Sequence, residues 1–220
     1  MTRSRIIALI GIDGAGKSTS AQWLVGWLAE RGVPASHFMN PGGRRWLGRL
    51  GQRLGRTDAV GLLGRRGFPV AEAIIRFAAL LRALLICRLR GRVAVMDRYT
   101  YCQYAVMRAR GDAGERLIRI LYSLFPRPDL VCYLQVEPGA AHHRVLQRGT
   151  DEEEIEHLRA LDAGYLSLPE FGRFRIVSAG AGPDVVQAQL AAAVAPLFRP
   201  PAQRRRRLTA IAPVFGGPGS

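Results

Sequence analysis

The segment Gly11-Ile12-Asp13-Gly14-Ala15-Gly16-Lys17-Ser18-Thr19 constrains the fold more than any other part of this 220-residue chain. It joins an apolar run at residues 6–10 to a helix-forming stretch, and it fits the phosphate-binding pattern G-x-x-x-x-G-K-[ST]. Glycines let backbone N–H groups converge on phosphate oxygens, because no Cβ blocks the approach. In such loops the lysine reaches the β- and γ-phosphates and the serine hydroxyl binds Mg²⁺. The loop therefore predicts ATP and Mg²⁺ as cofactors, bound through Gly11, Gly14, Ala15, Gly16, Lys17, Ser18 and Thr19.

Lys17 is also the only lysine in the chain, and arginine supplies every other permanently charged basic side chain. Whatever bias removed lysine elsewhere did not remove it here. This supports a functional role for the ammonium group of Lys17.

Apolar runs and helical periodicity alternate along the rest of the chain. We expect strands at residues 5–10, 34–39, 92–97, 129–136 and 173–178, and helices at 17–31, 69–90, 100–110, 113–125, 138–147, 152–168 and 183–198. Short helical pieces are expected in the glycine- and arginine-rich segment 40–68. Helix 69–90 is apolar nearly all round, which predicts a buried helix. The alternation predicts an α/β fold with a parallel, doubly wound sheet covered on both faces.

The sequence indicates one domain over residues 1–198, followed by a disordered basic tail at 199–220. The tail contains Arg204 to Arg207 and ends in glycine and proline. No apolar run reaches the ~18 residues needed to span a bilayer, and no membrane is expected as a partner. The three cysteines lack C-x-x-C spacing, so we expect reduced thiols and a cytoplasmic protein.

The net charge of +15 allows two interpretations. It could attract nucleic acid or another polyanion. It could equally reflect an arginine-rich composition and a basic tail. Because no nucleic-acid-binding motif accompanies the charge, nucleic acid is not expected as a partner.

A second candidate site lies at the end of the strand at 92–97, where Asp97 and Arg98 follow one another. Ligands of a doubly wound sheet bind at the carboxyl ends of its strands. Asp97 is therefore placed to bind a metal-bound water, and Arg98 to bind a phosphate bidentately. The alternative is an ion pair that only closes the strand.

Two further candidates are less specific. Asp13 is not required by the loop pattern, and it either faces the acceptor or caps a turn. Arg144 and Arg148 share a helix face before Gly149. They either belong to a lid at about 144–153 that closes over the transferring phosphoryl group, or occupy a solvated helix end.

With these motifs in hand, the chain resembles the thymidylate kinase family from about residue 4 to residue 195. The resemblance rests on the loop with its aspartate before Gly-Ala-Gly-Lys-Ser-Thr, on Asp97-Arg98-Tyr99 with Ala105, and on Pro128-Asp129-Leu130 leading through the strand into Tyr133-Leu134-Gln135-Val136-Glu137-Pro138. The segment Arg144…Arg148-Gly149 completes it. The family implies a P-loop NTPase three-layer fold with a five-stranded parallel sheet and a short lid.

The family also implies residue roles. The substrate is a nucleoside 5′-monophosphate, most often dTMP, and the donor is ATP with Mg²⁺. Asp13 would face the acceptor sugar and Arg98 its phosphate, with Asp97 and Ser18 at the metal. Because Gly14 stands where some members carry an arginine, the catalytic arginine would be Arg148, with Arg144 second.

The base-reading part departs from the family. Phe77 matches a phenylalanine that stacks on thymine, but the arginine expected four residues later is Leu81, and Arg82 is one position off register. Cys102 replaces a serine and Val106 a tyrosine, while Gln103 remains able to bond a base edge.

Three functions follow as hypotheses. The first is a thymidylate kinase-like nucleoside monophosphate kinase, converting dTMP to dTDP. The second is a kinase of the same fold with a different small phosphate, phosphonate or hydroxyl acceptor, and the third a non-enzymatic nucleotide- or nucleic-acid-binding protein. A homodimer through the apolar helices at 69–90 and 113–125 is an additional expectation.

Overall fold

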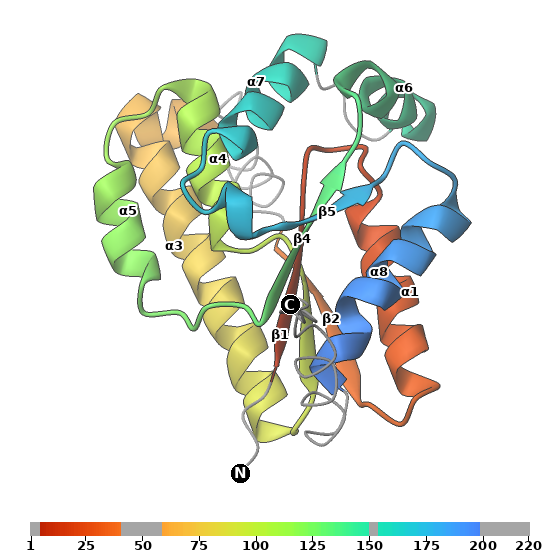
Figure 1. Ribbon diagram of the computed structural model, residues 1–220. Helices are drawn as coiled ribbons and strands as arrows, with labels where there is room; N and C mark the ends of the chain where they lie inside the picture. Colours follow the sequence, from red (N-terminus) through yellow and green to blue (C-terminus); the bar gives the residue numbers. More distant parts are fainter. Residues whose placement is uncertain (1–4, 41–58, 150–153, 199–220) are drawn as a thin grey trace, which may run out of the picture.

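Five parallel strands form one sheet in the computed structural model, which describes residues 5–40, 59–149 and 154–198 (Figure 1). The strands are β1 (Ile6–Ile10), β2 (Ala35–Met39), β3 (Val93–Asp97), β4 (Leu130–Gln135) and β5 (Arg175–Ser178). Their spatial order is β2-β3-β1-β4-β5. β1 is central and all five of its residues are buried, as expected for a parallel strand covered on both faces.

Helices cover both faces of the sheet (Figure 1). One face carries α1 (Lys17–Ala29) and α8 (Pro183–Phe198), and the other carries α3 (Ala59–Leu89), α4 (Thr100–Arg110) and α5 (Glu115–Tyr122). Across the carboxyl ends of the strands lie α6 (Pro138–Arg148) and α7 (Ile155–Leu166). A 3₁₀ turn, η1 (Phe171–Arg173), precedes β5.

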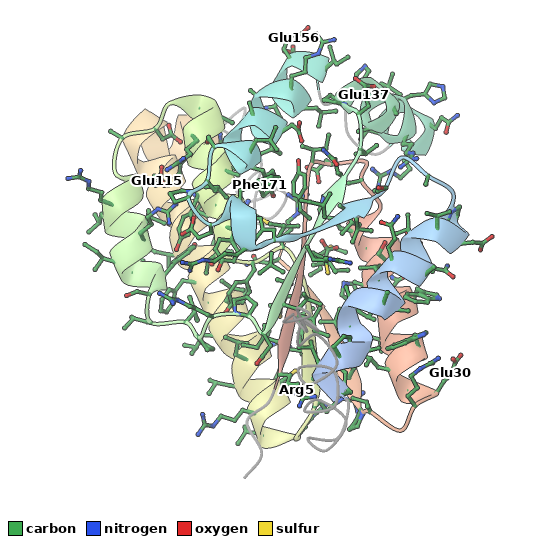
Figure 2. The ribbon with its side chains drawn as sticks, in the orientation of Figure 1. Arg5, Glu30, Glu115, Glu137, Glu156 and Phe171 are labelled. Carbon is green, nitrogen blue, oxygen red and sulfur yellow. The ribbon has the colours of Figure 1, made fainter. Side chains whose placement is uncertain are left out.

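The sequence explains where α6 begins and ends. Glu137, seen at the start of this helix in Figure 2, accepts a hydrogen bond from the Ala140 N–H at 2.9 Å, and Pro138 occupies the first turn. A side-chain acceptor at this position satisfies a backbone donor that the helix leaves unpaired. Gly149 ends the helix with φ +60°. These signals set the two ends of α6 along the chain.

The predicted α/β fold with a five-stranded parallel sheet is confirmed, and each expected strand and helix is present. The expectation of short helical pieces at 40–68 is wrong for 59–68, which continue into α3 without a break. Glycine disfavours a helix by only about 1 kcal/mol per residue, so a long helix tolerates several. Residues 41–58 lie outside the described part, as do 150–153 of the expected lid and the tail at 199–220.

The prediction that helix 69–90 is buried all round is also wrong. Its inner face packs on the sheet through Leu80, Ala83 and Cys87, at helical spacing. The opposite face is exposed at Ile74, Leu81, Leu85 and Leu89. Among the described residues, no helix is long and apolar enough to cross a membrane. The three cysteines, Cys87, Cys102 and Cys132, are buried.

Candidate functional site

The phosphate-binding loop turns from β1 into α1 through two glycines at which any side chain would force the surrounding backbone to move. Gly11 has φ +141°, and a Cβ there would lie 2.7 Å from the Leu134 carbonyl oxygen. Gly14 has φ +87°, and its Cβ would lie 2.3 Å from the Ala141 carbonyl oxygen of α6. Both contacts are closer than a side-chain carbon can approach, so the loop is pressed between β4 and α6.

Lys17 is the first residue of α1 and its side chain is buried. Its Nζ donates to the Ile12 carbonyl at 2.7 Å and to Asp13 Oδ1 at 3.2 Å. Burial lowers the pKa of Lys17 below its ordinary value, and the neighbouring Arg98 lowers it further, while Asp13 and Asp97 act in the opposite direction. The ammonium group is thus held inside the loop, where an anionic ligand would stabilise its charge.

Ser18 and Asp97 meet beside the loop. The Ser18 Oγ donates to Asp97 Oδ2 at 2.5 Å. Asp97 Oδ1 is buried and accepts no hydrogen bond from the residues that the structure describes. His37 Nε2 lies 3.9 Å from Asp97 Oδ2. A hydroxyl and a carboxylate with an unused oxygen are the hard oxygen ligands that Mg²⁺ prefers, so this pair fits the predicted metal site.

Within the described residues no cluster of three or more His, Cys, Asp or Glu side chains surrounds this pair. Mg²⁺ commonly binds one or two protein ligands and completes its shell with water and substrate phosphates. The two-residue set is therefore sufficient for such a site.

Arg98 follows Asp97 in an unusual backbone conformation. Its φ of +76° is the one positive value at a non-glycine residue in the described ranges, and its N–H donates to the Leu9 carbonyl of β1 at 3.1 Å. A left-handed conformation costs an L-residue roughly 1–2 kcal/mol. Strain of this kind persists where the surrounding structure enforces it, often at ligand sites.

The Arg98 guanidinium donates from Nη2 to Asp13 Oδ1. Burial is the largest single effect and lowers the Arg98 pKa, but Asp13 and the weaker attractions of Cys102, Tyr165 and Asp97 together outweigh it, so the Arg98 pKa is raised. Asp13 Oδ1 also accepts from Lys17. One loop carboxylate therefore bridges the loop lysine and the strand-end arginine.

The two lid arginines lie apart from this cluster. Arg144 Nη1 donates to the Ala179 carbonyl at 2.9 Å, just after β5. Arg148 is exposed in the last turn of α6, and its Nε donates to the Arg144 carbonyl at 3.4 Å. The structure thus brings together Asp13, Lys17, Ser18, Asp97 and Arg98, but it does not bring Arg148 to them.

The predicted base-reading residues occupy two different environments. Phe77 is half-buried in α3, with its ring centroid 4.6 Å from that of Phe125 and 6.3 Å from that of Tyr122. Gln103 lies in the first turn of α4 and is 2% exposed. Its Oε1 accepts no hydrogen bond from described residues, although buried polar atoms are normally paired. Gln103 therefore offers a free acceptor, whereas Phe77 already packs against other rings.

Sequence reasoning missed two residues near the site. Asn40 is 2% exposed, follows β2, and donates its N–H to the Asp97 carbonyl at 3.0 Å. Its position directly after a strand was the available signal. Tyr165 of α7 is fully buried beside Arg98, and a tyrosine inside a helix carries no sequence signal that distinguishes it from core.

Comparison with known proteins gives concordant results. A sequence model of the family described as thymidylate kinase matches residues 10–190. A probable thymidylate kinase of Pyrococcus abyssi is 33% identical over 201 residues, which cover 87% of this chain and 96% of that protein. The thymidylate kinase of Chromohalobacter salexigens is 29% identical over 212 residues, covering 87% and 95%. A probable thymidylate kinase of Archaeoglobus fulgidus is 35% identical over 167 residues, covering 73% and 80%.

Proposed function

Because the chain belongs to the thymidylate kinase family, we propose that it transfers the γ-phosphoryl group of ATP to dTMP, giving ADP and dTDP. The names of the relatives favour dTMP over the alternative acceptors. The observation that carries the proposal is the Asp13 bridge between Lys17 and Arg98. Lys17, on the donor side, and Arg98, on the acceptor side, both contact the Asp13 carboxylate. A donor phosphate bound to Lys17 and an acceptor phosphate bound to Arg98 would therefore lie next to each other.

On the donor side, we propose that the loop N–H groups and Lys17 bind the triphosphate of ATP. The negatively charged phosphate would replace Asp13 as the ion-pair partner of Lys17. Ser18 and Asp97 would hold Mg²⁺, which supplies neutralising charge to the phosphoryl group in transfer. Arg144, half-buried beside the Ala179 carbonyl, would contribute to the nucleotide site.

On the acceptor side, Arg98 would bind the 5′-phosphate through two parallel N–H groups. Asp13, relieved of both cations, would accept a hydrogen bond from a sugar hydroxyl. The free Oε1 of Gln103 is an acceptor suited to the N3–H group of thymine. Phe77 would contact the base through the part of its ring that the aromatic cluster leaves open.

The reaction forms a bond from an acceptor phosphate oxygen to the γ-phosphorus and breaks the bond between that phosphorus and the bridging oxygen of ADP. Such transfer depends on positioning and on charge stabilisation. Because residues 11–19 of the loop include no arginine, an arginine that contacts the transferring group must come from another segment. We therefore propose Arg148, carried inward with the lid, as the arginine that contacts the transferring group.

A homodimer is a further part of this proposal. Two groups of exposed residues supply apolar surface. The first is Leu81 and Leu85 of α3, and the second is Leu117 and Ile120 of α5 with Leu124 just after it. Light scattering of the purified protein tests it, and a monomer at assay concentration would remove it.

The test of function is ADP release with ATP, Mg²⁺ and a panel of nucleoside monophosphates. We expect turnover with dTMP and its loss in Lys17→Ala, because the loop loses its only cationic contact to the γ-phosphate. The variant should keep the wild-type circular dichroism spectrum. Turnover of Lys17→Ala at the wild-type rate would contradict the assignment of the loop, and the absence of dTMP turnover in the wild-type protein would contradict the acceptor.

A further inference from the structure

Tyr165 follows an unusually close contact between two helices. α7 lies beside α4 (Figure 1). A Cβ at Gly164 would lie 2.5 Å from the Ala105 carbonyl oxygen of α4, so the two backbones touch there. The next residue, Tyr165, is fully buried. It thereby reaches Cys102, one turn before Ala105 in α4.

The neighbours of Tyr165 include an aromatic ring of β4 and charged residues of the candidate site. Its ring centroid lies 5.4 Å from that of Tyr133 in β4. Its hydroxyl lies beside the Cys102 thiol, and the charges of Arg98 and Asp13 act on it. Burial, together with Cys102, raises the Tyr165 pKa well above its ordinary value, so the phenol stays a neutral hydrogen-bond donor.

This hydroxyl lacks a strong partner. No nitrogen or oxygen atom of the described residues hydrogen-bonds to it, and a thiol is a weak acceptor. Two other buried tyrosines differ: Tyr133 donates to Asp162 of α7, and Tyr99 donates to the Pro126 carbonyl at 2.7 Å. A buried hydroxyl without a strong partner calls for a specific reason, such as a ligand.

We propose that the Tyr165 hydroxyl donates a hydrogen bond to the acceptor phosphate that Arg98 binds. Arg98 supplies the positive charge, and the adjacent phenol supplies a neutral donor to another oxygen of the same group. Cys102 matters here because a serine at 102 would accept strongly and hold the hydroxyl. The inference rests on the proposed function, since it takes a nucleoside monophosphate as the ligand of Arg98.

The test is calorimetric binding of dTMP and of thymidine, which lacks the phosphate, to the full chain. Hydrogen bonds to charged groups predict that Tyr165→Phe raises the Kd for dTMP about 10- to 100-fold. The Kd for thymidine and the KM for ATP should not change. Tyr133→Phe is the matched control, because it removes a hydroxyl that anchors the same helix away from the phosphate site. It should lower the melting temperature without changing the Kd for dTMP.

Cys102→Ser provides a second, independent variant. It should also raise the Kd for dTMP, because the serine oxygen would capture the Tyr165 hydroxyl. Its effect should not add to that of Tyr165→Phe, since both act on one hydrogen bond.

The outcomes separate the inference from the proposed function. If wild-type protein phosphorylates dTMP but Tyr165→Phe binds it with unchanged Kd, the inference alone is overturned. The same holds if the variant loses dTMP and thymidine equally. Should Tyr165→Phe fail to fold, an unchanged Kd in Cys102→Ser would overturn it. A wild-type protein that neither binds nor phosphorylates dTMP would overturn both.

Discussion

Replacing Gly14 by alanine tests the close contact between the phosphate-binding loop and α6. The added Cβ would lie 2.3 Å from the Ala141 carbonyl oxygen and 2.9 Å from the Ala141 carbonyl carbon and Cα. These are backbone atoms inside a helix, so they cannot rotate away as a side chain would. Either the loop or α6 must move.

The expected cost has two parts. The φ of +87° at Gly14 places alanine in the left-handed region, at about 1–2 kcal/mol. Forcing an extra carbon into a packed contact costs about 1–3 kcal/mol. The free energy of unfolding should therefore fall by roughly 2–5 kcal/mol. At about 2–4 °C per kcal/mol for a domain of this size, the melting temperature should fall by about 4–20 °C.

Gly16→Ala is the control, because Gly16 has φ +82° but, its chain neighbours aside, no atom of the described residues lies within 4 Å of its Cβ position. It should show the backbone strain alone, a fall of about 2–8 °C. The assay is thermal unfolding of the two variants and the wild type without nucleotide, followed by circular dichroism. Equal melting temperatures for Gly14→Ala and Gly16→Ala would refute the reasoning, since the contact with α6 would then yield at no cost.

Three further predictions concern charge. Asp97→Asn should keep the hydrogen bond from the Ser18 hydroxyl but weaken the apparent affinity for Mg²⁺ about 10- to 100-fold. Titration of turnover with Mg²⁺ measures this affinity, and an unchanged titration would exclude Asp97 from the metal site. Since Lys17 is the only lysine, a protein with ¹³C-labelled lysine should give one titrating NMR signal. The pKa of Lys17 should lie below 10.5 and should rise when ATP adds negative charge beside it. A fall in this pKa on ATP binding would contradict the loop assignment. Glu115→Gln should destabilise the protein by about 1.5–3 kcal/mol at neutral pH, because Glu115 accepts from Arg108 and Arg119. These bonds, Arg108 first, lower the Glu115 pKa, so this stability is present above pH 4.5 and is lost as pH falls through the lowered pKa. The difference in melting temperature should therefore shrink in acid, and a constant difference would contradict this.

Glu115 also shows why such pairs escape sequence reasoning. It lies at the start of α5 (Figure 2) and joins α4 to the region after α7 through Arg119, whose Nη1 donates to Glu170 at 2.5 Å. The contact with Glu170 spans 51 residues. Nothing in local periodicity specifies which of many arginines will meet which carboxylate, because the pairing depends on how the helices dock.

The fold itself was predictable because its signals are local. Apolar runs of strand length, a glycine-rich turn and helical periodicity each fall within a window of about 15 residues. Asp97 could be assigned to the site for a related reason: parallel strands deliver their carboxyl ends to one edge. Only topology, and no side-chain geometry, was needed to bring it to Ser18.

The features that the sequence could not predict depend on contacts between residues that lie far apart in the chain. The helical character of 59–68 was hidden because glycine lowers propensity without deciding conformation. The exposed face of α3 was misjudged because an apolar circumference is compatible with either core or surface. Tyr165 was missed because its importance comes from the contact of Gly164 with Ala105.

Asp13 pairs with both cationic side chains of the site. A carboxylate inside a phosphate-binding loop repels the ligand unless cations offset it, and here Lys17 and Arg98 both pair with the same oxygen. In the proposed binding mode, each phosphate would take one cation from Asp13, so part of its attraction would be spent on breaking an existing ion pair. The two cations would in turn already lie near their proposed binding positions, which would reduce the ordering needed on binding. The resulting expectation is weaker affinity for a single nucleotide than the two cations alone would suggest, with both nucleotides needed to release Asp13 for the sugar.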